Sequence, residues 1–316
     1  MMKKNLYVWM SVLFIVFSWE SVAQRSQYDD LRRYIGKSTV STIDSATIRI
    51  TYSLNYVPDS AKLQKVMKDR KVLLIGNEWM HFYSYYVHQS DSALTADFDK
   101  GKNSAPLKRA TDIGGEGYEI FTHIPARTRT VLEPISDLSL YRYEEPAVTP
   151  QWIISNDTCR ILSYTCLKAA TRFRGRDWTV WFTTEIPLNA GPWKLGGLPG
   201  LILKAADSKN HYVFECIGIE QLKKTKQPMI MLQNSWNYTK CTRAEYRKVQ
   251  RQFYDNNVNA LLSLGFNVNI VDDDGKRLER IETPNKMFAE RNISWSTRVN
   301  AADRYKKIPF NPIELE

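Results

Sequence analysis

Histidine and cysteine are scarce in this sequence, with four of each among 316 residues. The histidines are scattered, and the chain contains neither the HExxH pattern of zinc peptidases nor the GxSxG turn of serine hydrolases. These absences exclude both of those catalytic arrangements. We therefore expect neither a metal nor a cofactor.

Complete phosphate-binding and calcium-binding loops are also missing. Gly36–Ser38 ends like a phosphate-binding loop, but Leu31 stands where the first glycine is required. Asp272–Gly275 has the acidic character of a calcium loop, but Ile270 stands where the first carboxylate belongs. We expect a tight turn rather than a calcium site at Asp272–Gly275.

Long apolar runs are absent after Val87, so no later segment is predicted to span a membrane. One apolar run, Leu6–Phe17, lies near the start and is too short to cross a bilayer comfortably. It follows Lys3 and Lys4, and the small-x-small sequence Ser21–Ala23 comes after it. This order of basic, apolar and small residues is typical of a signal peptide.

We therefore predict that residues 1–23 are a cleavable signal peptide and that the mature chain begins at Gln24. The protein should be periplasmic or secreted, which removes nucleic acid as a partner. Its formal net charge of +10 would favour peripheral contact with anionic lipid head groups. A solvated basic surface without a partner has the same composition.

The composition is that of a folded chain with a substantial core. Hydrophobic residues make up 43% of the sequence and aromatic residues 12%, which is too much for a disordered chain. No internal repeat or sharp change of composition divides it. We predict one β-rich domain over residues 24–316, with a polar tail from about residue 272.

Alternation of apolar and polar residues is the main structural signal. Residues 48–56 carry apolar side chains at every second position, which predicts a half-buried strand. Apolar segments 71–75 and 79–87 flank Gly76-Asn77, a hairpin pattern. Further strand-like segments bounded by turn residues are 161–170, 178–184, 201–205 and 212–219. Closely spaced strands with short connections predict a mainly β fold built as an antiparallel meander.

One amphipathic helix is predicted after Thr242, a suitable N-cap with Glu245 three residues later. Its apolar positions are Tyr246, Val249, Phe253, Ala260, Leu261 and Leu264. Gly265 would end it. Basic residues recur every four positions on another face, namely Arg243, Arg247 and Arg251. The pattern fits a helix packed on the sheet, and it also fits a helix lying on a membrane surface.

The four cysteines, Cys159, Cys166, Cys216 and Cys241, all lie in the predicted exported part. An even number in an oxidising compartment permits two disulfides, and free buried thiols are the alternative. We rank the pair Cys166 and Cys216 first because both are expected on adjacent β segments. A bridge requires their Cα atoms to lie within about 7 Å of each other.

Three neighbouring pieces of sequence, Trp178–Pro187, Gly191–Lys194 and Gly197–Ile202, resemble the GLPGLI family of exported Bacteroidetes proteins. Supporting matches are Leu74–Gly76, Phe82–Ser84, Cys166 with Lys168-Ala169, Phe173–Arg176 and Asn311–Leu315. The family has a weaker similarity to the bowl-shaped N-terminal domain of some bacterial peptide:N-glycosidases, which is accessory to the catalytic part. The resemblance implies a curved antiparallel sheet, half-barrel or bowl-like, without chemistry of its own.

The motif residues themselves indicate a rigid loop between two strands. Pro199 and Gly200 suit the second and third positions of a type II turn, which puts Gly200 at positive φ. Pro187 and Pro192 lack an amide donor and end the preceding strand. A structural role is assigned to Pro187, Gly191, Pro192, Gly197, Leu198, Pro199, Gly200, Leu201 and Ile202.

Candidate ligand-binding residues lie beside this loop. Trp178, Trp181 and Trp193 could hold an apolar or sugar ligand, or could be part of the core. Glu185 could serve a glycosidase only with a second carboxylate roughly 5 to 10 Å away, and the sequence identifies none. A strand-end glutamate that accepts hydrogen bonds from the loop amides is the alternative. We name no catalytic residue.

Three functions fit these observations. The first is a non-enzymatic envelope protein that binds an apolar small molecule or a partner protein, such as an outer-membrane or envelope protein, on the concave face of its sheet. The second is a hydrolase, or an accessory module of an enzyme that acts on glycans or peptides. The third is a purely structural assembly factor. Two carboxylates or a Cys–His pair converging in the concavity would favour an enzyme.

Overall fold

The computed structural model describes residues 39–89, 116–136, 139–223, 228–234, 238–263, 266–282, 295–304 and 307–316. The predicted signal peptide and its cleavage site lie outside these residues. Within the described part, none of the helices combines the length and hydrophobicity needed to cross a membrane.

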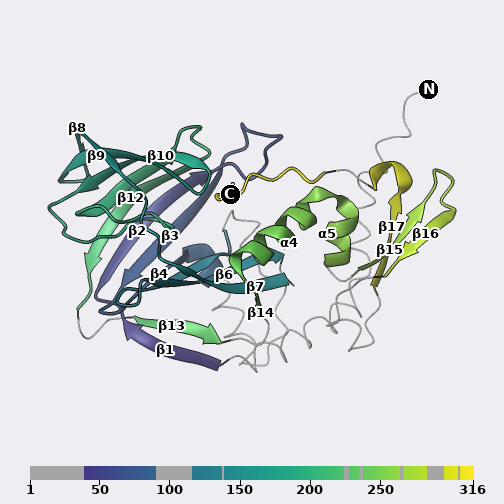
Figure 1. Cartoon of the computed structure of the whole chain (residues 1–316), viewed down its shortest axis with the longest axis horizontal. Coiled ribbons are helices and arrows are strands. Elements are labelled where there is room, and N and C mark those ends of the chain that lie inside the picture. The colour runs from purple at the N-terminus through teal and green to yellow at the C-terminus, as the bar shows by residue number, and fades with distance from the viewer. Residues whose placement is uncertain are drawn as a thin grey trace.

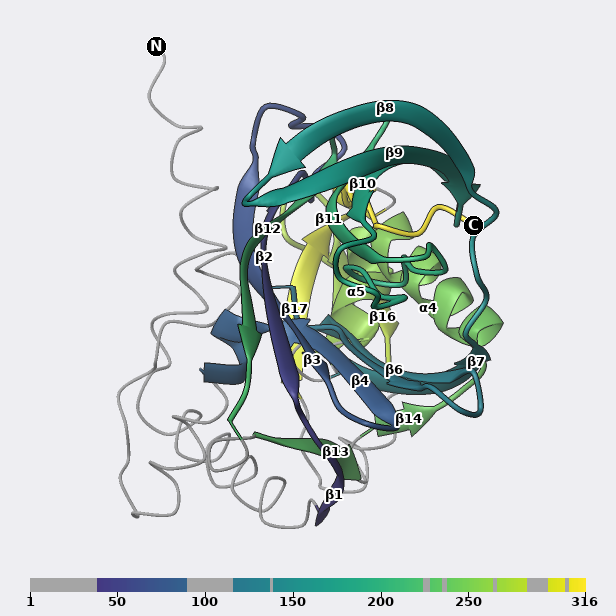
Figure 2. The same ribbon diagram turned by 90° about the vertical axis from the view of Figure 1, so that its left-hand side faces the viewer.

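The fold is mainly β, as predicted, and its principal feature is an open curved sheet with the strand order β14-β7-β6-β5-β4-β3-β2-β12-β11-β10-β9-β8. The strands are β2 (Ile48–Tyr56), β3 (Met67–Ile75), β4 (Trp79–Ser84), β5 (Glu119–His123), β6 (Thr128–Ser136), β7 (Ser139–Pro146), β8 (Ile153–Ile161), β9 (Tyr164–Phe173), β10 (Arg176–Thr183), β11 (Leu201–Asp207), β12 (Tyr212–Gln221) and β14 (Tyr238–Lys240). Neighbours are antiparallel except for the parallel pair β14 and β7. Figure 2 shows the curvature of this sheet, and Figure 1 shows α4 beside β6 and β7 toward one end of it.

Local sequence explains several of these strands directly. The alternation in β2 buries Ile50, Tyr52 and Leu54 on the concave side, which confirms the predicted half-buried strand. The hairpin predicted at Gly76-Asn77 joins β3 to β4, and Asp44 stabilises its turn. The Asp44 Oδ2 atom accepts from the backbone amides of Glu78 at 2.8 Å and Trp79 at 3.0 Å.

Helix α4 (Arg243–Asp255) contacts β7 of the curved sheet, and α5 (Asn257–Ser263) contacts the strand β15 (Phe266–Val271) (Figure 1). The predicted N-terminal capping box is present, because Thr242 and Glu245 bond reciprocally to each other's backbone amides. Tyr246 and Phe253 are buried in the main core, so α4 packs on the sheet.

The predicted single helix is interrupted, which the sequence pattern did not reveal. Asn256 has an extended backbone with φ −158° and ψ 161°. Its side-chain Oδ1 accepts from the amide of Asn259 at 2.8 Å. An asparagine side chain competes in this way with continued helix and starts a new one. The helical ladder therefore ends before α5 begins.

Two smaller sheets flank the main one. Strands β1 (Thr39–Ser45) and β13 (Met229–Asn234) form an antiparallel pair. Strand β15 (Phe266–Val271) pairs with β16 (Arg277–Ile281) and, in parallel, with β17 (Trp295–Asn300), which the short 3-10 helix η3 (Ala301–Asp303) follows. The segment predicted as a polar tail thus contains two strands. The tight turn predicted at Asp272–Gly275 is confirmed by the bond from Gly275 N to Asp272 O at 3.0 Å.

The end segment, residues 307–316, returns to the curved sheet and is held there by Arg176. The guanidinium Nε of Arg176 donates to Ile313 O at 2.9 Å, and its Nη2 donates to Asn311 Oδ1 at 2.8 Å. The same guanidinium pairs with Asp207 at 2.9 Å. Ile313 joins the main core. The concave face is therefore covered by the helices and by the end segment of the chain itself.

Candidate functional site

The residues between β10 and β11, 184–200, form what we call the signature loop. β10 and β11 pair directly, so the loop is an excursion between two neighbouring strands. Gly197 has φ +91°, the left-handed conformation that glycine adopts without strain. Trp193 also has a positive φ, of 56°, which is unfavourable for a bulky residue. A backbone of this kind persists only where surrounding contacts fix it.

The predicted positive φ at Gly200 is wrong, because the positive-φ glycines that the structure describes are Gly175, Gly197 and Gly275. Gly200 is required for a different reason. A Cβ atom there would overlap the carbonyl oxygen of Thr183. The backbone of the loop lies against the end of β10 at this point, so the restriction is a close approach and not a turn type.

The three tryptophans named from the sequence do not share one surface. Trp178 and Trp193 are 1% and 5% exposed and pack together with ring centroids 5.5 Å apart. The indole Nε1 of Trp178 donates to Phe173 O at 3.3 Å. Trp181 is only partly buried, and Lys168 Nζ lies 5.9 Å from its ring centroid. Trp178 on β10 and Trp193 in the signature loop are therefore both part of the main core.

Glu185 lies apart from the buried tryptophans, exposed at the start of the loop. Its Oε1 atom accepts a hydrogen bond of 2.7 Å from the backbone amide of Thr165 on β9. It therefore bonds to an amide of a neighbouring strand rather than to the amides of its own loop. The structure does not bring Glu185 and the tryptophans together in one site.

A shallow hollow of about 380 Å³ lies at the signature loop. Its lining residues are Pro187, Asn189, Gly197, Leu198, Pro199 and Gly200. The side-chain Oδ1 of Asn189 accepts from the amide of Gly197, which fixes the carboxamide at the hollow. Trp152 Nε1 donates to Gly196 O at 2.8 Å and supports the loop from the side. The hollow thus combines proline rings with a positioned amide.

A second hollow, of about 430 Å³, is lined by Arg49 and by residues 220–223. Arg49 pairs with Glu220 at 3.2 Å, and both side chains are well exposed. This hollow lies on a different part of the sheet and holds no residue named from the sequence.

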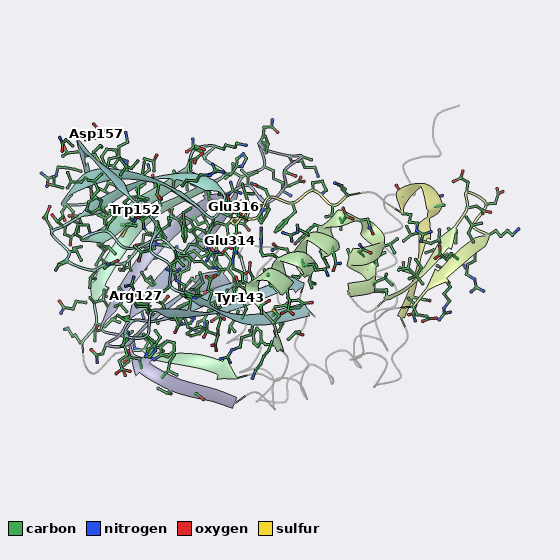
Figure 3. All side chains as sticks on the ribbon, in the orientation of Figure 1. Arg127, Tyr143, Trp152, Asp157, Glu314 and Glu316 are labelled. Carbon is green, nitrogen blue, oxygen red and sulfur yellow. The ribbon has the colours of Figure 1, made fainter. Side chains whose placement is uncertain are left out.

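A buried ion cluster holds the signature loop in place through Lys194. Lys194 Nζ lies 2.7 Å from Glu145 Oε1 and 2.5 Å from Glu314 Oε1. Arg174 pairs with Glu145 at 2.9 Å, and Arg243 pairs with Glu314 at 2.6 Å. Lys194, Glu145 and Glu314 are nearly inaccessible, with side chains 1%, 4% and 7% exposed. Figure 3 places Glu314 between the sheet and α4.

The cluster brings two carboxylates together on the concave side, since Glu145 and Glu314 contact the same ammonium group. A glycosidase requires such a pair, with one member protonated to act as the general acid. Burial alone would raise the pKa of Glu314, but the charges of Lys194 and Arg243 outweigh it and lower this pKa to about 2. Glu314 is therefore ionised at neutral pH and already bonded, which suits a fastening role.

Two other buried acids have raised pKa values. Burial raises the pKa of Glu133, whose Oε2 accepts from the Tyr143 hydroxyl at 3.0 Å. Burial also raises the pKa of Glu116 to about 7, although Lys71 opposes the shift. Neither acid lines either hollow.

Sequence reasoning did not identify the members of this ion cluster. Lys194 and Glu314 lie within sequence pieces that carry the family resemblance, Gly191–Lys194 and Asn311–Leu315. That coincidence was the available signal. Nothing local marks Glu145 as their partner, because the three residues meet only in the folded chain.

The cysteine ranking made from the sequence is wrong in its premise. Cys166 on β9 and Cys216 on β12 are not on adjacent strands, because β10 and β11 lie between them in the sheet. All four cysteines are free thiols in the structure. Cys166 instead stands opposite Cys159, its register partner on β8.

Comparisons with known proteins find similarity to N-glycanase proteins. The family profile described as the N-terminal domain of N-glycanase peptide, PNGase F-II, matches residues 145–247, which include the whole signature loop. Solved structures of PNGF-II in space groups P21 and C2 are similar, with a TM-score of 0.41 and identities of 14% and 15%. The alignments cover 65% of this chain but 33% and 32% of those chains, so this chain spans about a third of their length. No curated protein matches the sequence.

Proposed function

We propose that this protein is an exported, non-catalytic β domain that binds glycosylated peptide through the outer side of its signature loop, as an accessory module. The match to a peptide N-glycanase N-terminal domain across residues 145–247 supports it. The resemblance of Gly197–Ile202 to the exported GLPGLI family supports the same kind of module. Such a module needs a binding surface but not the two catalytic carboxylates of a glycosidase.

The geometry of the loop carries this proposal. Pro187 and Pro199 are exposed at the hollow, and the carboxamide of Asn189 accepts from the amide of Gly197 at the same hollow. Proline rings offer apolar surface to a sugar face, while an amide offers hydrogen bonds to hydroxyls. The loop backbone is fixed by the buried ion cluster, so binding would cost little ordering entropy.

The concave face, which the sequence suggested as the binding surface, is covered by α4 and by the end segment. A ligand there would have to displace Tyr246 and Ile313 from the core. The outer rim of the loop requires no such displacement. We therefore assign binding to the rim.

The test combines a binding measurement with an activity measurement on the same purified protein and the same N-glycosylated peptide. Calorimetry should detect binding, and mass spectrometry should show the peptide unchanged after long incubation. Asn189→Asp keeps the acceptor for Gly197 and removes the amide donor, so it should weaken binding. Gln221→Leu, in the second hollow, is the matched control and should bind as the wild type does.

A hydrolase is the second candidate, because Glu145 and Glu314 meet at one ammonium group. Conversion of the glycosylated asparagine to aspartate, abolished by Glu145→Gln, would establish it and reject the accessory role. Absence of both binding and conversion would reject both functions and leave the structural assembly role. If export occurs as proposed, protein isolated from its native envelope should have the intact mass of a chain that begins at Gln24.

A further inference from the structure

Two cysteines lie opposite each other in the β8–β9 hairpin. Cys159 on β8 and Cys166 on β9 are register partners of an antiparallel pair. The hairpin turns at Leu162-Ser163, and two register pairs separate the two cysteines from this turn. Side chains of directly opposed residues lie on the same face of a sheet. The two thiols therefore face each other across one strand spacing.

The spacing suits a covalent bridge. Opposed residues of an antiparallel pair have Cα atoms about 4.5 to 5.5 Å apart. Disulfides span Cα separations of about 4.4 to 6.8 Å. Cys159 is partly exposed while Cys166 is buried, so a reagent can reach one member of the pair from solvent.

The other two thiols are placed differently. Cys216 is not a register partner of Cys166, because β10 and β11 lie between their strands in the sheet. Cys241 follows β14 at the opposite end of the strand order, and its Sγ lies 3.9 Å from Arg142 O. The register thus selects one pair among the four cysteines.

We propose that Cys159 and Cys166 form a redox site that closes to a cross-strand disulfide and fixes the edge strand β8 to β9. The oxidant is a disulfide compound, either a small-molecule disulfide or an exchangeable disulfide of an oxidoreductase. The Cys159 thiolate attacks one sulfur of the oxidant, whose S–S bond breaks and releases one thiol. The Cys166 thiolate then displaces the second thiol from Cys159. Two electrons and the two thiol protons pass to the oxidant, which leaves as two thiols.

Oxidation would be slow at neutral pH and faster in alkali. Burial raises the pKa of the Cys159 thiol, and it raises that of Cys166 to about 11. The thiolate is the reacting species, so its small fraction limits the rate. An oxidoreductase disulfide or a long exposure would be needed in the native setting.

The bridge would matter for β8 because this strand is an edge. Among the described strands β9 is its one neighbour, and most of its side chains are exposed. The register is irregular between Ile154 and Thr158, so the pairing is continuous only from Thr158 to the turn. A disulfide at Cys159 would lock that continuous part. Edge strands with unpaired groups are prone to pairing with other chains, and a bridge restrains them.

The experiment oxidises the purified folded protein with oxidised glutathione and stops the exchange in acid. At this stage the intact mass should be lower by the mass of two hydrogen atoms. The remaining thiols are then alkylated in denaturant at neutral pH, and the peptides are mapped. Trypsin cleaves after Arg160, so the bridge should appear as residues 143–160 linked to residues 161–168, and reductant should separate them. Hydrogen exchange at the end of β8 should slow after oxidation.

Cys159→Ser should abolish the linked peptide, and Cys241→Ser, the matched control, should leave it intact. Circular dichroism checks that both variants are folded. If Cys159→Ser does not fold, Cys159→Ala replaces it. A linkage of Cys166 to Cys216 would overturn the assignment. The proposal would also be overturned if the folded wild-type protein is treated with excess oxidant at alkaline pH and all four thiols can still be alkylated after unfolding.

Discussion

The ammonium nitrogen of Lys194 lies 2.5 Å from Oε1 of Glu314, a residue 120 positions later in the sequence. Both side chains are almost fully buried, and Glu145 completes the contact at 2.7 Å. Through these bonds the signature loop, β7 and the end segment are held at one point. A buried ion pair of this kind adds little net stability by itself, but removal of one partner leaves a buried charge uncompensated.

Lys194→Met should therefore destabilise the protein strongly. The two glutamates would keep Arg174 and Arg243 as partners, so we expect a loss of about 3 kcal/mol in the free energy of unfolding. Urea denaturation measures it. Lys168→Met is the control, since Lys168 pairs with Asp157 at the surface and should cost about 0.5 kcal/mol or less. Equal effects of the two substitutions would contradict the fastening role.

Gly200→Ala should destabilise the fold although alanine is the smallest change available. The added Cβ would meet the backbone oxygen of Thr183, which cannot move without disturbing the end of β10. We expect a cost of about 1 to 3 kcal/mol. Gly196→Ala in the same loop is the matched control, because its Cβ would find its nearest atoms, on Asn189, at 3.7 Å. A thermal melt in which both variants match the wild type would reject the close approach.

Glu116 should make stability depend on pH between about 4.5 and 7. Burial raises its pKa to about 7 from the ordinary 4.5, so in this range the folded state holds a proton that the unfolded chain has lost. Stability should fall as the pH rises through the window, by up to about 3 kcal/mol, and stay lower above it.

The glutamine of Glu116→Gln does not titrate, so the variant lacks this pH dependence. The difference in unfolding free energy between wild type and variant should therefore change with pH between about 4.5 and 7. Glu144→Gln, at a side chain that is 72% exposed, is the control and should leave the difference flat. A flat difference for Glu116→Gln as well would show that Glu116 titrates in the folded protein as it does in the unfolded chain.

Glu185→Gln should leave the melting temperature unchanged. The carboxamide oxygen can still accept from the Thr165 amide, and the site is exposed, so we expect an effect within about 0.5 kcal/mol. The same variant should bind glycosylated peptide as the wild type does. A variant that melts normally but loses a measurable hydrolytic activity would reassign Glu185 as a catalytic residue.

Much of the fold could be predicted because its signals are local. The period-two pattern of β2 is set by which side chains face the core, and the turn at Gly76-Asn77 is marked by turn-forming residues within the turn itself. The capping box of Thr242 and Glu245 joins residues three positions apart. Such patterns depend only on residues close together in the sequence, so they can be predicted from the sequence alone.

The hairpin between β8 and β9 was missed for an equally local reason. Residues 161–170 read as one strand, whereas the structure turns at Leu162-Ser163 and starts β9 at Tyr164. Leu162 has φ 54°, a conformation that leucine rarely adopts, and the neighbouring residues do not predict it. The opposition of Cys159 and Cys166 was hidden with it.

The sequence by itself determined a mainly β chain, its principal hairpin and the start of its helix, because periodicity and short-range hydrogen bonds decide these. Only the tertiary structure decided that Lys194 meets Glu145 and Glu314, and that Gly200 is needed for contact with Thr183 rather than for a turn. The physical reason is that curvature of the sheet brings distant strands and the end segment together. Contacts between residues far apart in sequence leave no periodic trace in it.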